Sequence, residues 1–188
     1  AAAVRGGVTF AQLRDKDAST RDRIAAAHAL KGVLADSGVP LVINDDLDAV
    51  IAADVDGIHI GQEDVSSETA RRRLGRGKLI GLSCETPDQV AAADPHFVDY
   101  LCLGTVFPTG TKAAHKPVIG LAGLSEMVCF AQVPTVAIGG LKQEHAADVL
   151  KTGCDGIAVV SAICGQRDPA RAARAMCRAL QQKKEAHS

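Results

Sequence analysis

Three polar side chains near the amino end of the sequence alternate along one short segment. They are Gln12, Arg14 and Lys16 in QLRDK, which follows an apolar run. In a strand, alternate side chains point to one side, so this spacing would aim two cations and one amide at a cluster of anionic oxygens. The alternative is a solvated strand end with ordinary salt bridges. The residues alone leave both interpretations open, although Arg and Lys rarely enter an interior without a partner that neutralises them.

Oxygen ligands suited to a hard metal ion occur in two further segments. Asn44 and Asp45 lie in INDD, and Asp64 lies in GQED. Because Mg²⁺ prefers one or two carboxylates together with waters and phosphate oxygens, we predict that Asp45 and Asp64 bind Mg²⁺. The alternative is helix capping, since Asp46 and Asp64 both precede helical patterns.

A turn-forming segment, FPTGTK at residues 107–112, combines two hydroxyl groups with a lysine. Thr109, Gly110, Thr111 and Lys112 could fold over a phosphate, as other loops rich in Gly and Thr do. The glycine spacing is not that of a Walker motif, and a simple surface turn is the alternative.

Two segments nearer the carboxyl end, AIGGL and VVSAI, place backbone N–H groups beside small residues and expected helix starts. Such amides can hold a phosphate monoester without a cationic side chain. We predict this role for Gly140, Val160 and Ser161.

The elements that must position these side chains are short apolar runs, each followed by a stretch rich in Ala and Leu with charges at helical spacing. This alternation predicts a parallel sheet. Ser66, Thr86 and Asp168 stand where helix N-caps are expected. The seven predicted strands cover residues 8–14, 39–45, 57–62, 79–84, 100–107, 134–140 and 156–163. Helical patterns include residues 20–35, 66–74, 142–151 and 169–180.

Seven strand–helix units favour an α/β fold of the TIM (β/α)8 barrel class over an open Rossmann sheet. Nearly all of the polar residues above, and Ser83 after the fourth strand, fall at strand carboxyl ends, where such barrels place their chemistry. Residues 1–7 resemble the end of a helix, so we expect the first strand to be missing. We therefore expect one amino-terminally truncated barrel domain over residues 1–188, whose open sheet edges would favour association into a homo-oligomer.

Composition restricts the kinds of partner. The 188 residues are 47% hydrophobic, which suits one buried core, and the net charge of -1 argues against a nucleic-acid or membrane-surface binder. No apolar run reaches the roughly 18 residues that a membrane span needs. We expect small-molecule substrates and a cytoplasmic location.

Several conspicuous residues have structural interpretations. The six cysteines form no CxxC pair, so we interpret them as reduced core residues. His59 lies in an apolar run and is interpreted as a hydrogen-bonded core histidine. The run Arg71 to Arg73 is interpreted as a solvated helix face.

Six segments in order resemble successive motifs of the thiamine phosphate synthase family. Each motif is weak alone, but their order and spacing are specific, and together they span residues 4–163. The family's first strand and the helix after it are missing or truncated here, and Val160 stands where the family often has Ile. The segments are GVTFAQLRDKD, INDDLDAVIAADVDGIHIGQEDV, IGLSCETPDQ, LGTVFPTGTKAAHKPVIGL, PTVAIGG and GIAVVSAI.

The resemblance implies a role for each matching position. Asp45 and Asp64 would hold Mg²⁺, the implied cofactor. The catalytic residues would be Arg14, Lys16, Ser83 and Lys112. Contact with the hydroxymethylpyrimidine pyrophosphate is implied for Gln12, Leu13, Arg14, Asp15, Lys16, Asn44, Ser83 and Lys112. Contact with the thiazole phosphate is implied for Thr109, Gly110, Thr111, Gly140, Val160 and Ser161.

The implied reaction is a magnesium-dependent transfer of the pyrimidine group to the thiazole nitrogen, through a pyrimidine carbocation, with release of pyrophosphate. The departing group carries roughly three negative charges, which fixed cations would stabilise. Three alternatives stay open: a thiazole tautomerase-type barrel, a non-catalytic barrel that binds a phosphorylated metabolite, and a lyase with Lys16 or Lys112 as a Schiff-base nucleophile. The presence of Asp45, Asp64, Lys16 and Lys112 argues against the first.

Overall fold

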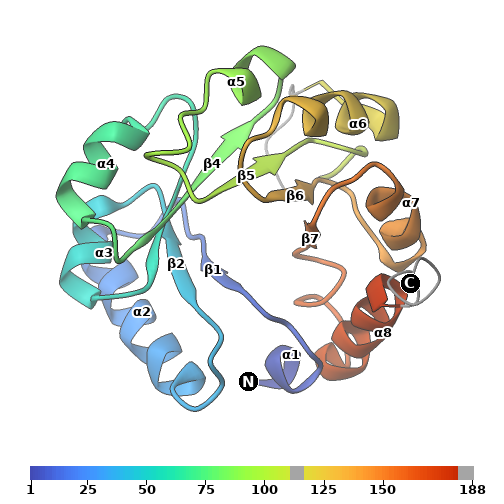
Figure 1. Cartoon of the computed structure of the whole chain (residues 1–188). Helices are drawn as coiled ribbons and strands as arrows, with labels where there is room; N and C mark the ends of the chain where they lie inside the picture. Colours follow the sequence, from blue (N-terminus) through green and yellow to red (C-terminus); the bar gives the residue numbers. More distant parts are fainter. Residues whose placement is uncertain (111–116, 182–188) are drawn as a thin grey trace. The chain divides into compact units, whose positions relative to one another are not determined.

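A computed structural model describes residues 1–110 and 117–181 of the chain (Figure 1). These residues group into two compact units, which are described separately below. The first unit contains residues 9–83 and 94–99, and the second contains residues 2–8, 84–93 and the chain from residue 100 onward. The expectation of one barrel domain stays a prediction.

The first unit is a parallel sheet whose strands follow one another in sequence order. β1 pairs with β2, β2 with β3, and β3 with β4, and the helices between them cover one face of this sheet (Figure 1). Its elements are β1 (Ala11–Leu13), α2 (Thr20–Leu34), β2 (Leu41–Asn44), α3 (Leu47–Ala53), β3 (Gly57–Ile60), α4 (Ser67–Leu74) and β4 (Leu79–Cys84), whose last residue falls in the second unit.

The second unit repeats the same alternation. β5 pairs in parallel with β6, and β6 with β7, while the short first helix of the chain packs against the last described helix (Figure 1). Its elements are α1 (Ala2–Arg5), α5 (Pro87–Ala91), β5 (Tyr100–Leu103), α6 (Gly120–Phe130), β6 (Thr135–Ile138), the 3-10 helix η1 (Gln143–His145), α7 (Ala146–Lys151), β7 (Gly156–Ala158) and α8 (Pro169–Gln181).

The two central strands of the first unit, β2 and β3, are buried along most of their length. Every residue of β3 is buried, and so are the first three residues of β2. Continuous rather than alternating burial is typical of parallel strands that are covered on both faces. Ile43, Ile58 and Ile80, from three neighbouring strands, are fully buried and form the centre of this core.

The predicted helix starts are confirmed. The side chains of Ser66, Thr86 and Asp168 accept hydrogen bonds from backbone N–H groups three residues later, at Thr69, Gln89 and Arg171. These bonds satisfy N–H groups that have no acceptor within the helix. The helical end predicted at residues 1–7 is confirmed as α1.

The seven predicted strands are present, but most are shorter than predicted. β5 ends at Leu103 rather than at residue 107, although Val106 is buried and donates its N–H to the carbonyl of Ile138. β7 ends at Ala158 rather than at residue 163. The apolar pattern continues into loops that pack against the core, so burial alone overestimates strand length.

The interpretation of Arg71 to Arg73 as a solvated helix face was wrong for Arg71. Its guanidinium donates to Asp99 at 2.6 Å and to the carbonyls of Gly75 and Lys78, and only 11% of its side chain is exposed. Arg72 and Arg73 pair with Glu68 and Asp48 on the surface as expected. The run therefore contains one anchoring residue and two surface residues.

The cysteines are free, as predicted, but they are not all core residues. Cys84, Cys102 and Cys154 are buried, whereas Cys129 and Cys164 are exposed. Burial raises the pKa of the Cys84 thiol to about 12. In the part of the chain that the structure describes, no helix is both long and apolar enough to cross a bilayer.

Thiol labelling tests this arrangement. In the native chain, Cys129 and Cys164 should react quickly with a disulfide reagent, whereas Cys84 and Cys154 should react only after unfolding, because burial keeps them protonated and out of reach. Replacing Cys129 and Cys164 by Ser should remove the fast phase. Fast labelling of Cys84 in the folded chain would contradict this structure.

Candidate active site

The predicted anion-binding segment begins at the carboxyl end of β1. Gln12 lies inside this strand, whereas Arg14 and Lys16 lie beyond its end at Leu13. The prediction that all three share a strand face was therefore wrong, because the strand is too short. The side-chain amide of Gln12 donates to Oδ1 of Asn44 at 3.3 Å, which links the ends of β1 and β2.

Asp45 follows β2 in a strained turn. Its φ of 65° lies in the left-handed region, which few non-glycine residues adopt, and its N–H donates to the carbonyl of His59 at 2.9 Å. The turn therefore directs the Asp45 carboxylate away from the path of the strand. Strain of this kind is often found at functional sites.

The charges around Asp45 include a second carboxylate and two cations. Burial, followed by a hydrogen bond and repulsion from Asp64, raises the pKa of Asp45 to about 6, while Lys16 and Arg14 act in the opposite direction. Nζ of Lys16 lies 4.0 Å from Oδ2 of Asp45. Asp64 is held in turn by the N–H of Gly61, which donates to its Oδ2 at 2.7 Å. The structure thus brings the two predicted metal ligands and the two predicted cations together.

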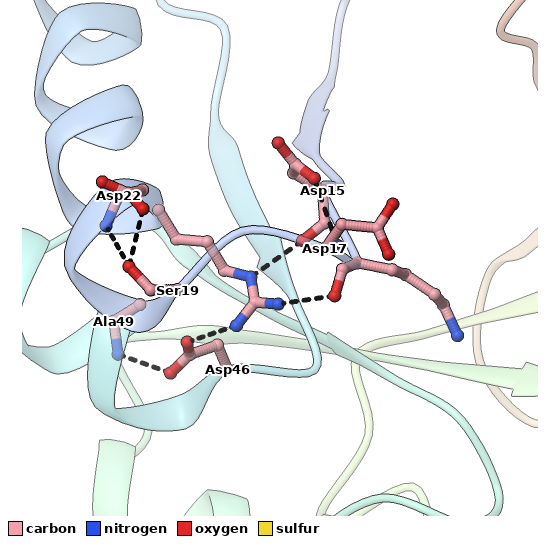
Figure 2. Close-up of polar contacts among 8 residues, drawn as sticks. Asp15, Asp17, Ser19, Asp22, Asp46 and Ala49 are labelled. Carbon is pink, nitrogen blue, oxygen red and sulfur yellow. Dashed lines mark hydrogen bonds and ion pairs between the residues drawn. The ribbon is translucent and has the colours of Figure 1, made fainter.

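Asp46 caps α3 and binds an arginine that the sequence analysis did not single out (Figure 2). Its Oδ1 accepts the N–H of Ala49, and its Oδ2 accepts Nη1 of Arg23, each at 2.9 Å. Burial acts to raise the pKa of Asp46, but these hydrogen bonds outweigh it and hold the pKa below the usual range. The capping role considered for Asp46 is confirmed, whereas the cap of α4 is Ser66 and not Asp64.

Ser83 lies at the carboxyl end of β4 and is held by two neighbours. Its Oγ is 2.9 Å from Nε2 of His59, and its carbonyl accepts the side-chain amide of Gln62 at 2.7 Å. His59 is buried, so the interpretation of this residue as a hydrogen-bonded core histidine is confirmed. Its partner, however, is a predicted catalytic residue.

In the second unit, the loop after β5 packs against the glycine pair after β6. The N–H of Phe107 donates to the carbonyl of Gly139 at 3.0 Å. Gly140 has a φ of 62°, and a Cβ at this position would lie 2.5 Å from the carbonyl oxygen of Pro108. Only glycine fits this backbone, which brings Gly140 beside the loop that carries Thr109 and Gly110.

Val160 and Ser161 lie beyond β7, not within its end as predicted, since the strand stops at Ala158. The carbonyl of Val160 accepts the N–H groups of Ile163 and Cys164, so the chain enters a helical turn at this point. The first amides of such a turn have no acceptor within it, which suits them to bind a phosphate. Val160 is 50% exposed.

Two predicted site residues, Thr111 and Lys112, lie outside the described residues. Among the residues that are described, no group of three or more His, Cys, Asp and Glu side chains could hold a metal ion. The pair Asp45 and Asp64 nevertheless fits Mg²⁺, which takes one or two carboxylates and completes its shell with water and phosphate oxygens. Two carboxylates held together against their mutual repulsion also favour a cation between them.

A sequence signal for Arg23 does exist. It lies in the first turn of α2, four residues after the N-cap Ser19. A cation at this end of a helix opposes the helix dipole, so its presence there suggests an acceptor outside the helix. The identity of that acceptor, Asp46, depends on the parallel pairing of β1 and β2 and could not be read from local sequence.

Comparisons with known proteins agree on one family. The family model described as thiamine monophosphate synthase matches residues 1–163. The thiamine-phosphate synthase of Xanthobacter autotrophicus is 48% identical over 93% of this chain and 83% of its own length, and that of Vibrio parahaemolyticus is 44% identical over 91% and 84%. A solved structure of thiamine phosphate pyrophosphorylase from Pyrococcus furiosus has a TM-score of 0.88 at 35% identity and covers 96% of this chain and 87% of that one. This likeness confirms the predicted α/β class of the TIM barrel type.

Substitution of Gly140 tests the packing of the second unit. Gly140→Ala should lower the free energy of unfolding by more than about 1 kcal/mol, because alanine is strained at positive φ and its Cβ meets a carbonyl. Gly32→Ala, inside α2 with open space around it, should instead stabilise the chain by up to about 1 kcal/mol. Denaturant unfolding of both variants measures the contrast, and equal effects would contradict the proposed packing.

Proposed function

This chain belongs to the thiamine monophosphate synthase family, and we propose from that premise that it transfers the hydroxymethylpyrimidine group from its pyrophosphate ester to hydroxyethylthiazole phosphate, giving thiamine phosphate and pyrophosphate. The chain is accordingly a transferase of thiamine biosynthesis. The observation that carries the detailed proposal is the grouping of Arg14 and Lys16 with Asp45 and Asp64 at the carboxyl ends of neighbouring strands.

Arg14 and Lys16 are assigned to the pyrophosphate of the pyrimidine substrate, together with Gln12, Asn44 and Ser83. The carbon–oxygen bond to pyrophosphate breaks with its electron pair on oxygen, so negative charge grows on the leaving group. Cations fixed beside that group stabilise the transition state more than the bound substrate. Leu13 and Asp15 complete this assigned segment, in which the carbonyl of Asp15 accepts a hydrogen bond from Arg23 and its carboxylate accepts one from the N–H of Asp17.

Asp45 and Asp64 are assigned to Mg²⁺. The ion would supply further positive charge to the pyrophosphate oxygens when bound. The protein's part is to hold the two carboxylates together, and it does so with the left-handed turn at Asp45 and the Gly61 N–H bond to Asp64.

The phosphate of the thiazole substrate is assigned to the second unit. Thr109, Gly110, Thr111, Gly140, Val160 and Ser161 form this set. The described members are mainly backbone groups in tight turns, which can bind a phosphate monoester without a charged side chain. The thiazole nitrogen attacks the pyrimidine methylene carbon with its own lone pair, so the reaction needs no general base.

The first test is pyrophosphate release on mixing the chain with both substrates, with Mg²⁺ or with EDTA. We expect release that requires both substrates and is abolished by EDTA. Release of no pyrophosphate under any condition would contradict the transferase proposal and favour a phosphometabolite-binding protein. Trapping of a substrate by borohydride would favour a Schiff-base lyase instead.

Asp45→Asn tests the metal assignment without disturbing the turn, because Asn tolerates the left-handed conformation. We expect turnover to fall at least about 100-fold, since a catalytic metal contributes several kcal/mol. We also expect the Mg²⁺ concentration that gives half-maximal activity to rise. The melting temperature should stay equal or rise, because the variant removes repulsion with Asp64. Unchanged Mg²⁺ dependence would refute Asp45 as a ligand.

Lys112→Ala tests the loop lysine. We expect turnover to fall far more than fold stability, because a cation beside the leaving group acts chiefly in the transition state. Lys151→Ala, which removes an exposed surface ion pair with Asp148, is the control and should leave both quantities nearly unchanged. If Lys112→Ala lowered thermal stability as severely as it lowered turnover, the assignment of Lys112 to the leaving group would be contradicted.

A further inference from the structure

Arg23 uses all three nitrogens of its guanidinium on acceptors from two separate segments of the chain (Figure 2). Nε donates to the carbonyl of Asp15 at 2.9 Å, Nη2 to the carbonyl of Lys16 at 3.2 Å, and Nη1 to Oδ2 of Asp46 at 2.9 Å. Only 19% of the side chain is exposed. Three of the five N–H groups of the guanidinium therefore hold protein groups, and its planar geometry suits it to bind all three acceptors at once.

The start of α2 fixes the point from which Arg23 reaches these acceptors. Oγ of Ser19 accepts the N–H of Asp22 and donates to its carboxylate at 2.7 Å (Figure 2). The N–H of Arg23 donates to the carbonyl of Ser19. The first turn of α2 is therefore capped and hydrogen-bonded at the residue from which the Arg23 side chain extends. A residue anchored at a capped helix end can hold a loop in one place.

The loop that Arg23 holds carries the two cations assigned to pyrophosphate. The carbonyls of Asp15 and Lys16 belong to consecutive residues just beyond β1, with Arg14 immediately before them. The pairing of β1 with β2 ends at Leu13. Beyond that point, Arg23 donates hydrogen bonds to the carbonyls of Asp15 and Lys16. Fixing these two carbonyls fixes the backbone from which the side chains of Arg14 and Lys16 leave.

The third acceptor belongs to the turn that carries a predicted metal ligand. Asp46 directly follows Asp45, and its second oxygen is fixed by the N–H of Ala49 in α3. Arg23 therefore joins the backbone of the cationic loop to the Asp45 turn. Between these anchored groups, Nζ of Lys16 lies 4.0 Å from Oδ2 of Asp45 although 61% of the Lys16 side chain is exposed.

We propose that Arg23 is a positioning residue that fixes the cationic loop at residues 14–16 relative to the Asp45 turn, and so sets the binding geometry for the pyrophosphate group of the pyrimidine substrate. This inference rests on the proposed function. It assigns no direct contact with substrate to Arg23. A lysine could not replace it, because one nitrogen cannot reach three separate acceptors with the same geometry.

A purely structural role is the rival explanation, and the chain offers a matched control for it. Arg71 makes the same kind of clamp in the same unit, with bonds to the carbonyls of Gly75 and Lys78 and to Asp99. Its loop precedes β4 and contains none of the predicted site residues. Arg23→Ala and Arg71→Ala should therefore lower the melting temperature to a similar extent and differ in their effects on the site.

The kinetic test compares the wild type with Arg23→Ala, Arg23→Lys and Arg71→Ala. For both Arg23 variants we expect kcat/KM for the pyrimidine pyrophosphate to fall between about 10-fold and 100-fold, as expected for misplacement of about 1 Å. KM for the thiazole phosphate should change less than about twofold in each, because the three acceptors of Arg23 all lie in the loop and turn assigned to the pyrophosphate and its metal ion. Arg71→Ala should keep both KM values. Full activity of Arg23→Lys, or equal kinetic loss in Arg71→Ala, would overturn the proposal.

A second measurement separates failure of this inference from failure of the proposed function. Calorimetry with inorganic pyrophosphate and Mg²⁺ needs no turnover, and we expect binding to the wild type and to Arg71→Ala but at least about 10-fold weaker binding to Arg23→Ala. If the wild type showed no turnover but the proteins showed this binding pattern, only the proposed transferase function would be refuted. No binding to the wild type, or equal binding to all the proteins, would overturn the positioning role of Arg23.

Discussion

The partial burial of the Asp45 carboxylate beside Asp64 is the constraint on which the predicted site in the first unit depends. Burial and proximity to Asp64 make the charged form of Asp45 unfavourable, as its raised pKa shows, and Arg14 and Lys16 offset this only in part. Two features hold the carboxylates near each other. Asp45 lies in a left-handed turn, and the carboxylate of Asp64 accepts the N–H of Gly61. A fold that maintains such a pair is prepared for a divalent cation, whose binding would relieve the repulsion that the free protein sustains.

The sequence predicted the order of the elements and the starts of several helices better than it predicted where strands end or which groups meet. Local signals identified the seven strands and the caps at Ser66, Thr86 and Asp168, because strand pattern and capping depend on residues a few positions apart. The prediction that the side chains of Arg14 and Lys16 share a strand face was wrong, because no local sequence feature shows that β1 ends at Leu13. Arg23 and Arg71 were missed or misread for a related reason. Each has one carboxylate acceptor, Asp46 for Arg23 and Asp99 for Arg71, that comes from a distant part of the sequence, and only the tertiary fold brings it within reach.

The two parts of the predicted site solve different electrostatic problems. The residues assigned to pyrophosphate include three cationic side chains, Arg14, Lys16 and Lys112, as a leaving group that gains negative charge requires. Those assigned to the thiazole phosphate are mainly backbone groups in glycine-containing turns, which suffice for an anion whose charge does not change during the reaction. This difference explains why the sequence signals differ: QLRDK and INDD are recognisable by charge, whereas AIGGL and VVSAI are recognisable only by small residues after a strand.

A reaction without a general base depends on where its charges are held. At the 4.0 Å that separates Lys16 from Asp45, two unit charges interact with about 1 kcal/mol in bulk water and about 4 kcal/mol near a protein surface. An exposed lysine on a mobile loop would stay near the lower value and would lose side-chain entropy on binding. Under the proposed role of Arg23, tying the loop backbone to the Asp45 turn fixes the backbone that carries Lys16 before the substrate arrives, so the backbone need not be ordered on binding. In this view the anchoring contacts contribute to catalysis through the position of the cations.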